Sequence, residues 1–182
     1  MLKEADIKNA MKILPYKYYH LVIIVSSEGH RISKILQDIS KKQGYHYINL
    51  NLTLSEKLIR FPIDQRCFYV EDFINEILDS CHAEALVLDN IGILFEPHLK
   101  IDPLLLLKNL SRYRSLVVHW NGKIEEGHLI YATASHPDYK KYKIDKYDYI
   151  IIDTAQQKDP QKHYIGEEIL FSLLTAAMGT IH

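Results

Sequence analysis

The sequence has little of what builds metal centres, disulfide frameworks or membrane spans. Its 2 cysteines, Cys67 and Cys81, lack the spacing of metal ligands, and none of its 10 histidines forms an HxxxH pair, so we expect reduced thiols and no structural metal site. No apolar run approaches the roughly 20 residues of a transmembrane helix. The first six residues include acidic side chains and no apolar stretch follows them, which predicts a cytoplasmic protein without a secretory signal or membrane attachment.

A strong excess of charge of one sign is absent as well. The formal net charge of the 182 residues is -1, so overall charge does not predict a nucleic-acid-binding protein, although a local basic patch is compatible with it. Hydrophobic residues make up 47% and charged residues 25%, close to ordinary globular usage. This length and composition predict one domain with a sizeable core.

What the sequence has in abundance is short apolar runs. Five of them predict strands buried on both faces, at residues 21–25, 45–50, 85–88, 115–119 and 149–152. Segments with apolar residues at helical spacing lie between them, at 32–39, 54–60, 70–78 and 103–110. Gly44 is a helix-end signal and Pro103 a helix-start signal. This alternation predicts an α/β fold in which a five-stranded, mainly parallel sheet has helices on both faces.

The regular alternation changes after the fourth strand. Asn121-Gly122 and Gly127 each predict a turn, and Ile124 with residues 129–131 predicts a small hairpin insertion.

The chain beyond the fifth strand has a different character. The polar stretch 154–162 contains Pro160 and predicts a linker, and residues 165–178 predict an amphipathic helix. We therefore expect an α/β domain over residues 1–153, followed by a linker and C-terminal helix over 154–182.

The loop after the first strand occupies the place of a phosphate-binding Walker A loop, G-x-x-x-x-G-K-[ST], and predicts a three-layer P-loop NTPase-like fold of the ASCE or AAA-like kind. If Ser33 supplies the motif's hydroxyl, then Ser26 replaces the first glycine, Arg31 the second, and Ile32 the lysine. Backbone N–H groups at such a helix start bind phosphate whatever the side chains are. The alternative is an ordinary strand–loop–helix turn with a helix-capping serine.

The missing lysine removes a point charge from the site. Arg31 and Lys34 are candidates to replace it, but each helical step turns a side chain by about 100°, so neither takes the lysine's direction automatically. Glu28 adds negative charge where phosphate would lie.

Asp89 ends the third strand after three apolar residues, as in a Walker B motif whose carboxylate holds Mg²⁺. Asn90 stands where many ATPases of this class have a catalytic glutamate, and an amide is a poor base. The alternative role for Asp89 is to cap a helix beginning near Ile91. Asn121 is either a polar sensor of the γ-phosphate or part of a turn.

These positions define a candidate nucleotide site without an assigned catalytic residue, whose only candidate cofactor is ATP or ADP with magnesium. Its residues are Ser26, Ser27, Gly29, His30, Arg31, Ser33, Lys34, Asp89, Asn90 and Asn121, with Ser33 and Asp89 as the magnesium ligands. We expect no efficient ATPase from this set.

A second candidate surface interleaves lysines with tyrosines over residues 139–147. Cations on phosphates with aromatic rings on bases hold nucleic acid, so this segment is a candidate DNA contact; the alternative is a solvated connection. Candidate subunit or nucleic-acid contacts are Arg112, Arg114, Lys140, Lys141, Lys143 and Lys146.

Several further segments are distinctive as a set. They read INLNL at 48–52, LDNIGILF at 88–95, DPLL at 102–105, LSR at 110–112, and WNG to HPDY at 120–139. Together they resemble the BrxF family, the small P-loop-containing proteins of type III BREX phage-exclusion systems. The resemblance spans about residues 21–153. It implies a bacterial role in phage defence beside a large ATPase, a DNA methyltransferase and a phosphatase-like protein.

Three hypotheses follow. The first is an accessory subunit with a degenerate P-loop, which acts through protein contacts with these partners or with further copies of itself. The second is a Mg-ATP-binding switch or weak ATPase, and the third is a DNA-binding module.

Overall fold

A parallel sheet of five strands lies at the centre of the protein, in a computed structural model that describes residues 2–144 and 148–155. Its strands are β1 (Leu21–Ser26), β2 (His46–Asn49), β3 (Ala85–Asp89), the first part of β4 (Ser115–Glu125) and β7 (Ile150–Asp153). Their order is β2-β3-β4-β1-β7, and every neighbouring pair is parallel. The predicted α/β class and its mainly parallel sheet are confirmed.

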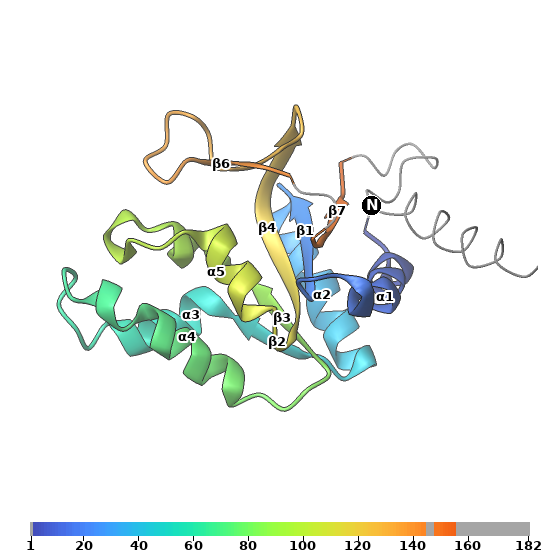
Figure 1. Cartoon of the computed structure of the whole chain (residues 1–182), viewed down its shortest axis with the longest axis horizontal. Coiled ribbons are helices and arrows are strands. Elements are labelled where there is room, and N and C mark those ends of the chain that lie inside the picture. The colour runs from blue at the N-terminus through green and yellow to red at the C-terminus, as the bar shows by residue number, and fades with distance from the viewer. Residues whose placement is uncertain (1, 145–147, 156–182) are drawn as a thin grey trace, which may run out of the picture.

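Helices cover both faces of this sheet (Figure 1). On one face lie α1 (Glu4–Ile13) and α2 (Gly29–Gln43). On the other lie α3 (Leu50–Leu58), α4 (Val70–Asp79) and α5 (Pro103–Leu110). Short 3₁₀ segments connect them: η1 (Leu14–Tyr16), η2 (Arg66–Phe68), η3 (Ile91–Phe95) and η4 (Pro97–Leu99).

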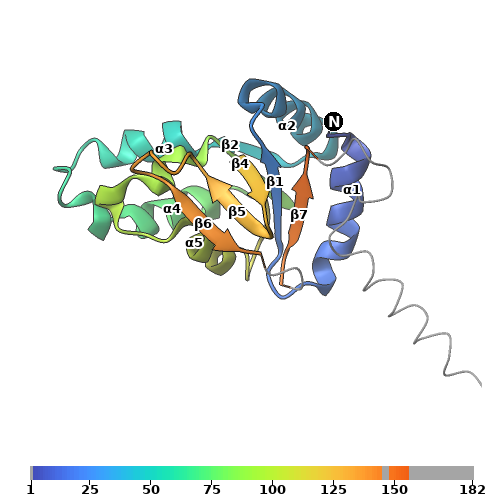
Figure 2. The ribbon, with the colours of Figure 1, turned by 90° about the horizontal axis from the view of Figure 1, so that it is seen from above.

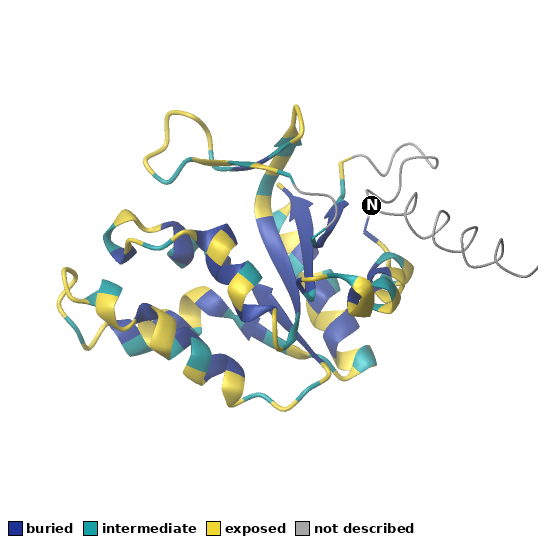
Figure 3. Ribbon diagram, in the orientation of Figure 1, coloured by how far each residue is buried: buried dark blue, intermediate teal, exposed yellow. Residues whose placement is uncertain are grey.

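The strands have near-continuous apolar sequences because each lies between two helical layers. Along β1, Ile23 and Val25 pack on the α3–α5 side, whereas Val22 and Ile24 pack on the side of α1 and α2. Every residue of β1 and β3 is buried, which appears as the dark central strands of Figure 3.

The fourth strand does not stop where the sequence predicted a turn. Asn121 and Gly122 lie inside β4, which continues to Glu125 and pairs antiparallel with β5 (His128–Tyr131). Gly122 permits this pairing, because a Cβ there would lie 2.0 Å from the backbone oxygen of Ile130. The turn predicted at Gly127 is present, and the hairpin insertion is larger than expected because β6 (Lys140–Lys143) adds a third strand. Viewed from above, this antiparallel extension overhangs the α3–α5 layer (Figure 2).

Several helix boundaries differ from those predicted. Leu50 begins α3 instead of ending β2, because the Asn49 side chain accepts the backbone N–H of Leu52 at 3.2 Å and caps the helix. Helix α1 was not predicted. Gly44 ends α2 with a φ of 71°, and Pro103 begins α5, both as expected.

The chain beyond residue 155, with the linker and the helix predicted at 165–178, lies outside the described residues. Within the described ranges, no helix combines the length and apolar character needed to cross a membrane.

Candidate functional site

The loop between β1 and α2 is short and tightly bonded. Only Ser27 and Glu28 separate the strand from the helix. The Glu28 N–H donates to the Ser26 hydroxyl at 3.0 Å, and the Ile32 N–H donates to the Glu28 carbonyl at 3.1 Å. No residue from 26 to 33 has a positive φ, so the loop does not form the phosphate-binding nest in which right- and left-handed residues alternate. The geometry is that of a strand–loop–helix turn closed by a serine.

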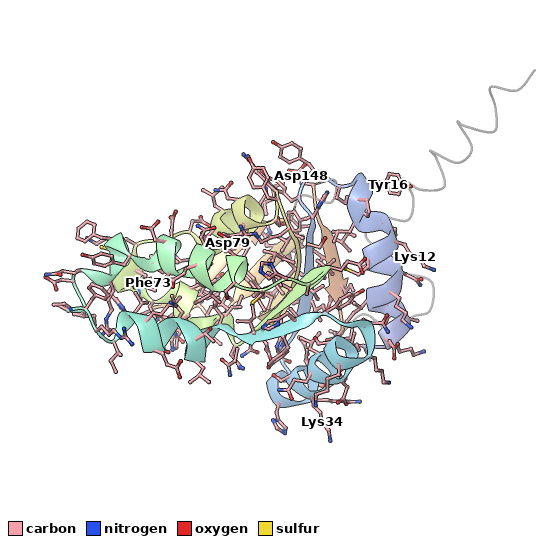
Figure 4. The ribbon with its side chains drawn as sticks, turned by 90° about the horizontal axis from the view of Figure 1, so that it is seen from below. Lys12, Tyr16, Lys34, Phe73, Asp79 and Asp148 are labelled. Carbon is pink, nitrogen blue, oxygen red and sulfur yellow. The ribbon has the colours of Figure 1, made fainter. Side chains whose placement is uncertain are left out.

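The side chains of this loop do not rebuild the missing lysine. Arg31 forms an exposed ion pair with Glu28 at 3.1 Å, one turn away along the chain. Ile32 is buried between α2 and the sheet. His30 and Lys34 are exposed, and Figure 4 shows Lys34 pointing away from the sheet.

Beneath the start of α2, a buried polar cluster surrounds Asp89 at the end of β3. His119 of β4 lies with its Nδ1 2.8 Å from one carboxylate oxygen of Asp89, and the Tyr47 hydroxyl of β2 donates to the other at 2.6 Å. The Asn90 N–H donates to the first oxygen at 2.8 Å. Asp89 is fully buried and His119 is 4% exposed. Parallel pairing therefore unites polar side chains from three neighbouring strands.

This cluster fixes the protonation of Asp89. Burial alone would raise its pKa, but the hydrogen bond from His119, the nearby Ser33 hydroxyl, and the hydrogen bonds from Tyr47 and the Asn90 backbone outweigh burial and lower the pKa to about 2. Burial, followed by the bond to Asp89, raises the pKa of Tyr47 to about 12. Asp89 is thus a carboxylate and Tyr47 a neutral donor near neutral pH.

Two members of the cluster, Tyr47 and His119, were not among the predicted site residues. The sequence did carry a signal for them, because Tyr47, Asp89 and His119 are polar positions in or directly after predicted parallel strands. That these strands are neighbours is known only from the structure. The Nε2 atom of His119 is buried and has no hydrogen-bond partner within the described residues.

The residues do not fit a magnesium–nucleotide complex. Both oxygens of Asp89 already accept donors, and the Ser33 hydroxyl donates to the Gly29 carbonyl at 3.0 Å. The described residues contain no cluster of three or more His, Cys, Asp or Glu side chains suited to a metal ion. We therefore assign no step to a metal or a nucleotide.

The structure brings together some predicted site residues and separates others. Ser33 and Asp89 converge, and Asn121 lies opposite Ser26 in the β1–β4 register, exposed. Asn90 is exposed with a φ of 51°. Asp89 does not cap the following helix, because η3 has no side-chain cap.

A cavity of about 420 Å³ lies beside the loop at the ends of β1, β4 and β7. Its charged lining is mixed: Glu28, Arg31, Lys123 and Asp153. Burial raises the pKa of Asp153, which accepts the Ala155 N–H at 3.0 Å. Asp89 does not line this cavity, so cavity and carboxylate form no common site.

The predicted contact residues lie in two distant places. Arg114 pairs with Asp79 at 2.9 Å, whereas the Arg112 guanidinium lies 5.6 Å from the ring centre of Tyr18. Lys140, Lys141 and Lys143 are exposed on β6. Lys146 lies outside the described residues.

Comparisons with protein-family models, with curated proteins and with solved structures each found no match. The geometry above is therefore the basis for the functional argument that follows.

Proposed function

We propose that this chain is a cytoplasmic accessory subunit with a degenerate P-loop NTPase-like fold of the ASCE kind, and that it acts through protein contacts in a bacterial BREX phage-defence system. Its proposed partners are the large ATPase, the methyltransferase and the phosphatase-like protein that the family resemblance implies.

The strand order supports the fold assignment. Counted along the chain, the parallel strands lie in the order 2-3-4-1-5, with the first strand between the fourth and the fifth. This order is compatible with the proposed ASCE class, and it differs from the dinucleotide-binding order 3-2-1-4-5-6 and the flavodoxin-like order 2-1-3-4-5.

One observation carries the proposal of a non-catalytic role: the carboxylate at the Walker B position, Asp89, accepts hydrogen bonds from residues of the chain itself. His119 and Tyr47 occupy the two oxygens of Asp89 that would otherwise face a hydrated magnesium ion. The two-residue connection above it presents no nest, and Ile32 supplies no charge.

The surface that we propose for protein contact is the apolar tip, formed by Ile59, Ile63, Phe68 and Tyr69 between α3 and α4. Phe68 is 75% exposed and Ile59 73% exposed. Within the tip, the Tyr69 ring stacks on the Phe61 ring with ring centres 4.2 Å apart. Exposed apolar residues gathered at one end of a molecule are typical of protein interfaces.

Calorimetric titration of ATP and ADP, each with magnesium, into the purified chain tests the non-catalytic role. We expect no binding heat and no thermal shift at millimolar nucleotide, because a ligand bound only by the native state must raise its stability. Turnover of ATP at ordinary ATPase rates would overturn the proposal. A thermal shift without turnover would favour the Mg-ATP switch instead.

A further inference from the structure

The sheet edge opposite the loop carries an exposed tyrosine–arginine surface. It consists of Tyr16, Tyr18, His20, Arg112 and Tyr113, at the amino-terminal ends of the strands. Tyr113 is 87% exposed, Tyr16 79% and Tyr18 65%. Figure 4 looks onto this edge and shows Tyr16 projecting beyond the end of α1.

Backbone hydrogen bonds hold the two segments of this surface side by side. The His20 N–H donates to the Ser111 carbonyl at 3.0 Å, and the Leu116 N–H donates to the His20 carbonyl at 2.9 Å. Tyr18 and His20 therefore lie directly before β1, next to Arg112 and Tyr113 before β4, whereas Tyr16 ends η1.

The local charge is positive although the chain as a whole is not. Residues 12–20 and 108–114 contain Lys12, Lys17, Lys108, Arg112 and Arg114 and no acidic residue. Asp79 and Glu84 line a cavity with His20, Tyr113 and Arg114, so with Asp148 three carboxylates face five cations. Lys108 and Arg114 have acidic partners, Asp148 at 3.8 Å and Asp79 at 2.9 Å. Arg112 has none within the described residues; its guanidinium lies 5.6 and 5.8 Å from the ring centres of Tyr18 and Tyr19.

We propose that the tyrosine–arginine surface binds single-stranded nucleic acid. Exposed rings stack on unpaired bases and neighbouring cations bind phosphates, without a need for a particular sequence. Duplexes bury the faces of their bases, so they offer the tyrosines no stacking partner. The surface also differs from the apolar tip, whose exposed residues include isoleucines and a phenylalanine; here every large exposed apolar side chain is a tyrosine.

The test measures fluorescence anisotropy of labelled oligothymidylate, oligouridylate and a mixed-sequence duplex as the full chain is added at low salt. We expect both single strands to bind more tightly than the duplex, with affinity falling as salt rises. The ratio of the dissociation constants for oligothymidylate and oligouridylate identifies DNA or RNA as the preferred ligand. The variants Tyr18→Ala and Tyr113→Ala should each weaken binding roughly tenfold, and Arg112→Ala should weaken it and flatten its salt dependence.

Two control variants make the outcome specific. Tyr113→Phe keeps a ring and should bind as the parent chain does. Lys141→Ala with Lys143→Ala, on the distant β6, should also leave binding unchanged; if they abolish it, the surface is wrong and β6 is the site. Absence of single-strand binding overturns the proposal, as does loss of a protein partner on Tyr113→Ala with unchanged oligonucleotide binding.

Discussion

At the scale of single residues, Asp89 has the place that the sequence predicted and a different task. Three donors from the chain itself hold the carboxylate in its ionised form. Removing one of these donors costs about 1.5–3 kcal/mol, the usual contribution of a hydrogen bond to a charged group. The cluster is thus a structural element of the sheet edge.

The depressed pKa of Asp89 predicts how stability depends on pH. A carboxyl group whose folded pKa is about 2, against an ordinary 3.8, stabilises the fold above pH 4 and loses that contribution as pH falls towards 2. For this buried group the contribution is roughly 2–3 kcal/mol. Urea unfolding of the Asp89→Asn variant between pH 4 and pH 2 measures this effect. Its free energy of unfolding should fall less over this range than that of the parent chain.

Asp153→Asn provides the matched control for that experiment. Burial raises the pKa of Asp153, so its ionised form is disfavoured in the fold and its neutral replacement should not lose stability. Equal acid profiles for the parent chain and Asp89→Asn would contradict the role given to the cluster.

The sequence predicted where this cluster lies better than it predicted which residues form it. Runs such as Leu86–Leu88 before Asp89 reveal a carboxylate at a strand end, since burial on both faces leaves few polar residues. The partners of Asp89 come from strands that are distant along the chain. Which residues become partners of Asp89 depends on the strand order and on the face of the sheet to which Tyr47 and His119 point. Hydrophobic periodicity determines neither.

At the scale of elements, the longest strand shows how tertiary pairing overrides a local turn signal. Asn-Gly commonly forms a hairpin turn, yet β4 passes through Asn121 and Gly122 because β1 pairs on one side and β5 on the other. The turn forms instead at Glu126 and Gly127, both with positive φ. An aromatic cluster fixes the extension, with Tyr131 stacked on Phe95 at 3.5 Å between ring centres.

A methyl group at position 122 should separate the extension from the sheet. In Gly122→Ala the new Cβ would lie 2.0 Å from the Ile130 oxygen, so backbone must move and the hydrogen bond from the Trp120 indole to that oxygen, now 3.0 Å, should lengthen. We expect a stability loss of about 1–3 kcal/mol with a shift in Trp120 fluorescence.

Gly29→Ala is the control for this steric argument. Among the described residues, no atom outside its chain neighbours and its own helix backbone lies within 4 Å of a Cβ at Gly29. Because alanine is also the better helix former, stability should stay the same or rise slightly. A larger loss for Gly29→Ala than for Gly122→Ala would contradict both interpretations.

At the scale of the whole molecule, the two ends of the parallel strands carry different kinds of side chains. The carboxyl edge holds the closed loop and the buried Asp89 cluster, and the antiparallel extension overhangs one side of it (Figure 2). The amino edge carries exposed tyrosines, and the apolar tip lies at a third place, between α3 and α4. Because the apolar tip is exposed and the carboxylate at the carboxyl edge is buried, contact through the tip is the role that this arrangement favours.

The apolar tip leads to a prediction about that assembly. Phe68→Ser together with Ile63→Ser removes two exposed apolar side chains, so the free energy of unfolding should change by less than about 1 kcal/mol while partner binding weakens about tenfold or more. Co-purification of the tagged chain with the proposed partner proteins measures the effect. Leu105→Ser, which alters a 54% exposed leucine on α5, is the matched control. If the tip variant retains its partners, or Leu105→Ser loses them equally, contact occurs elsewhere on the molecule.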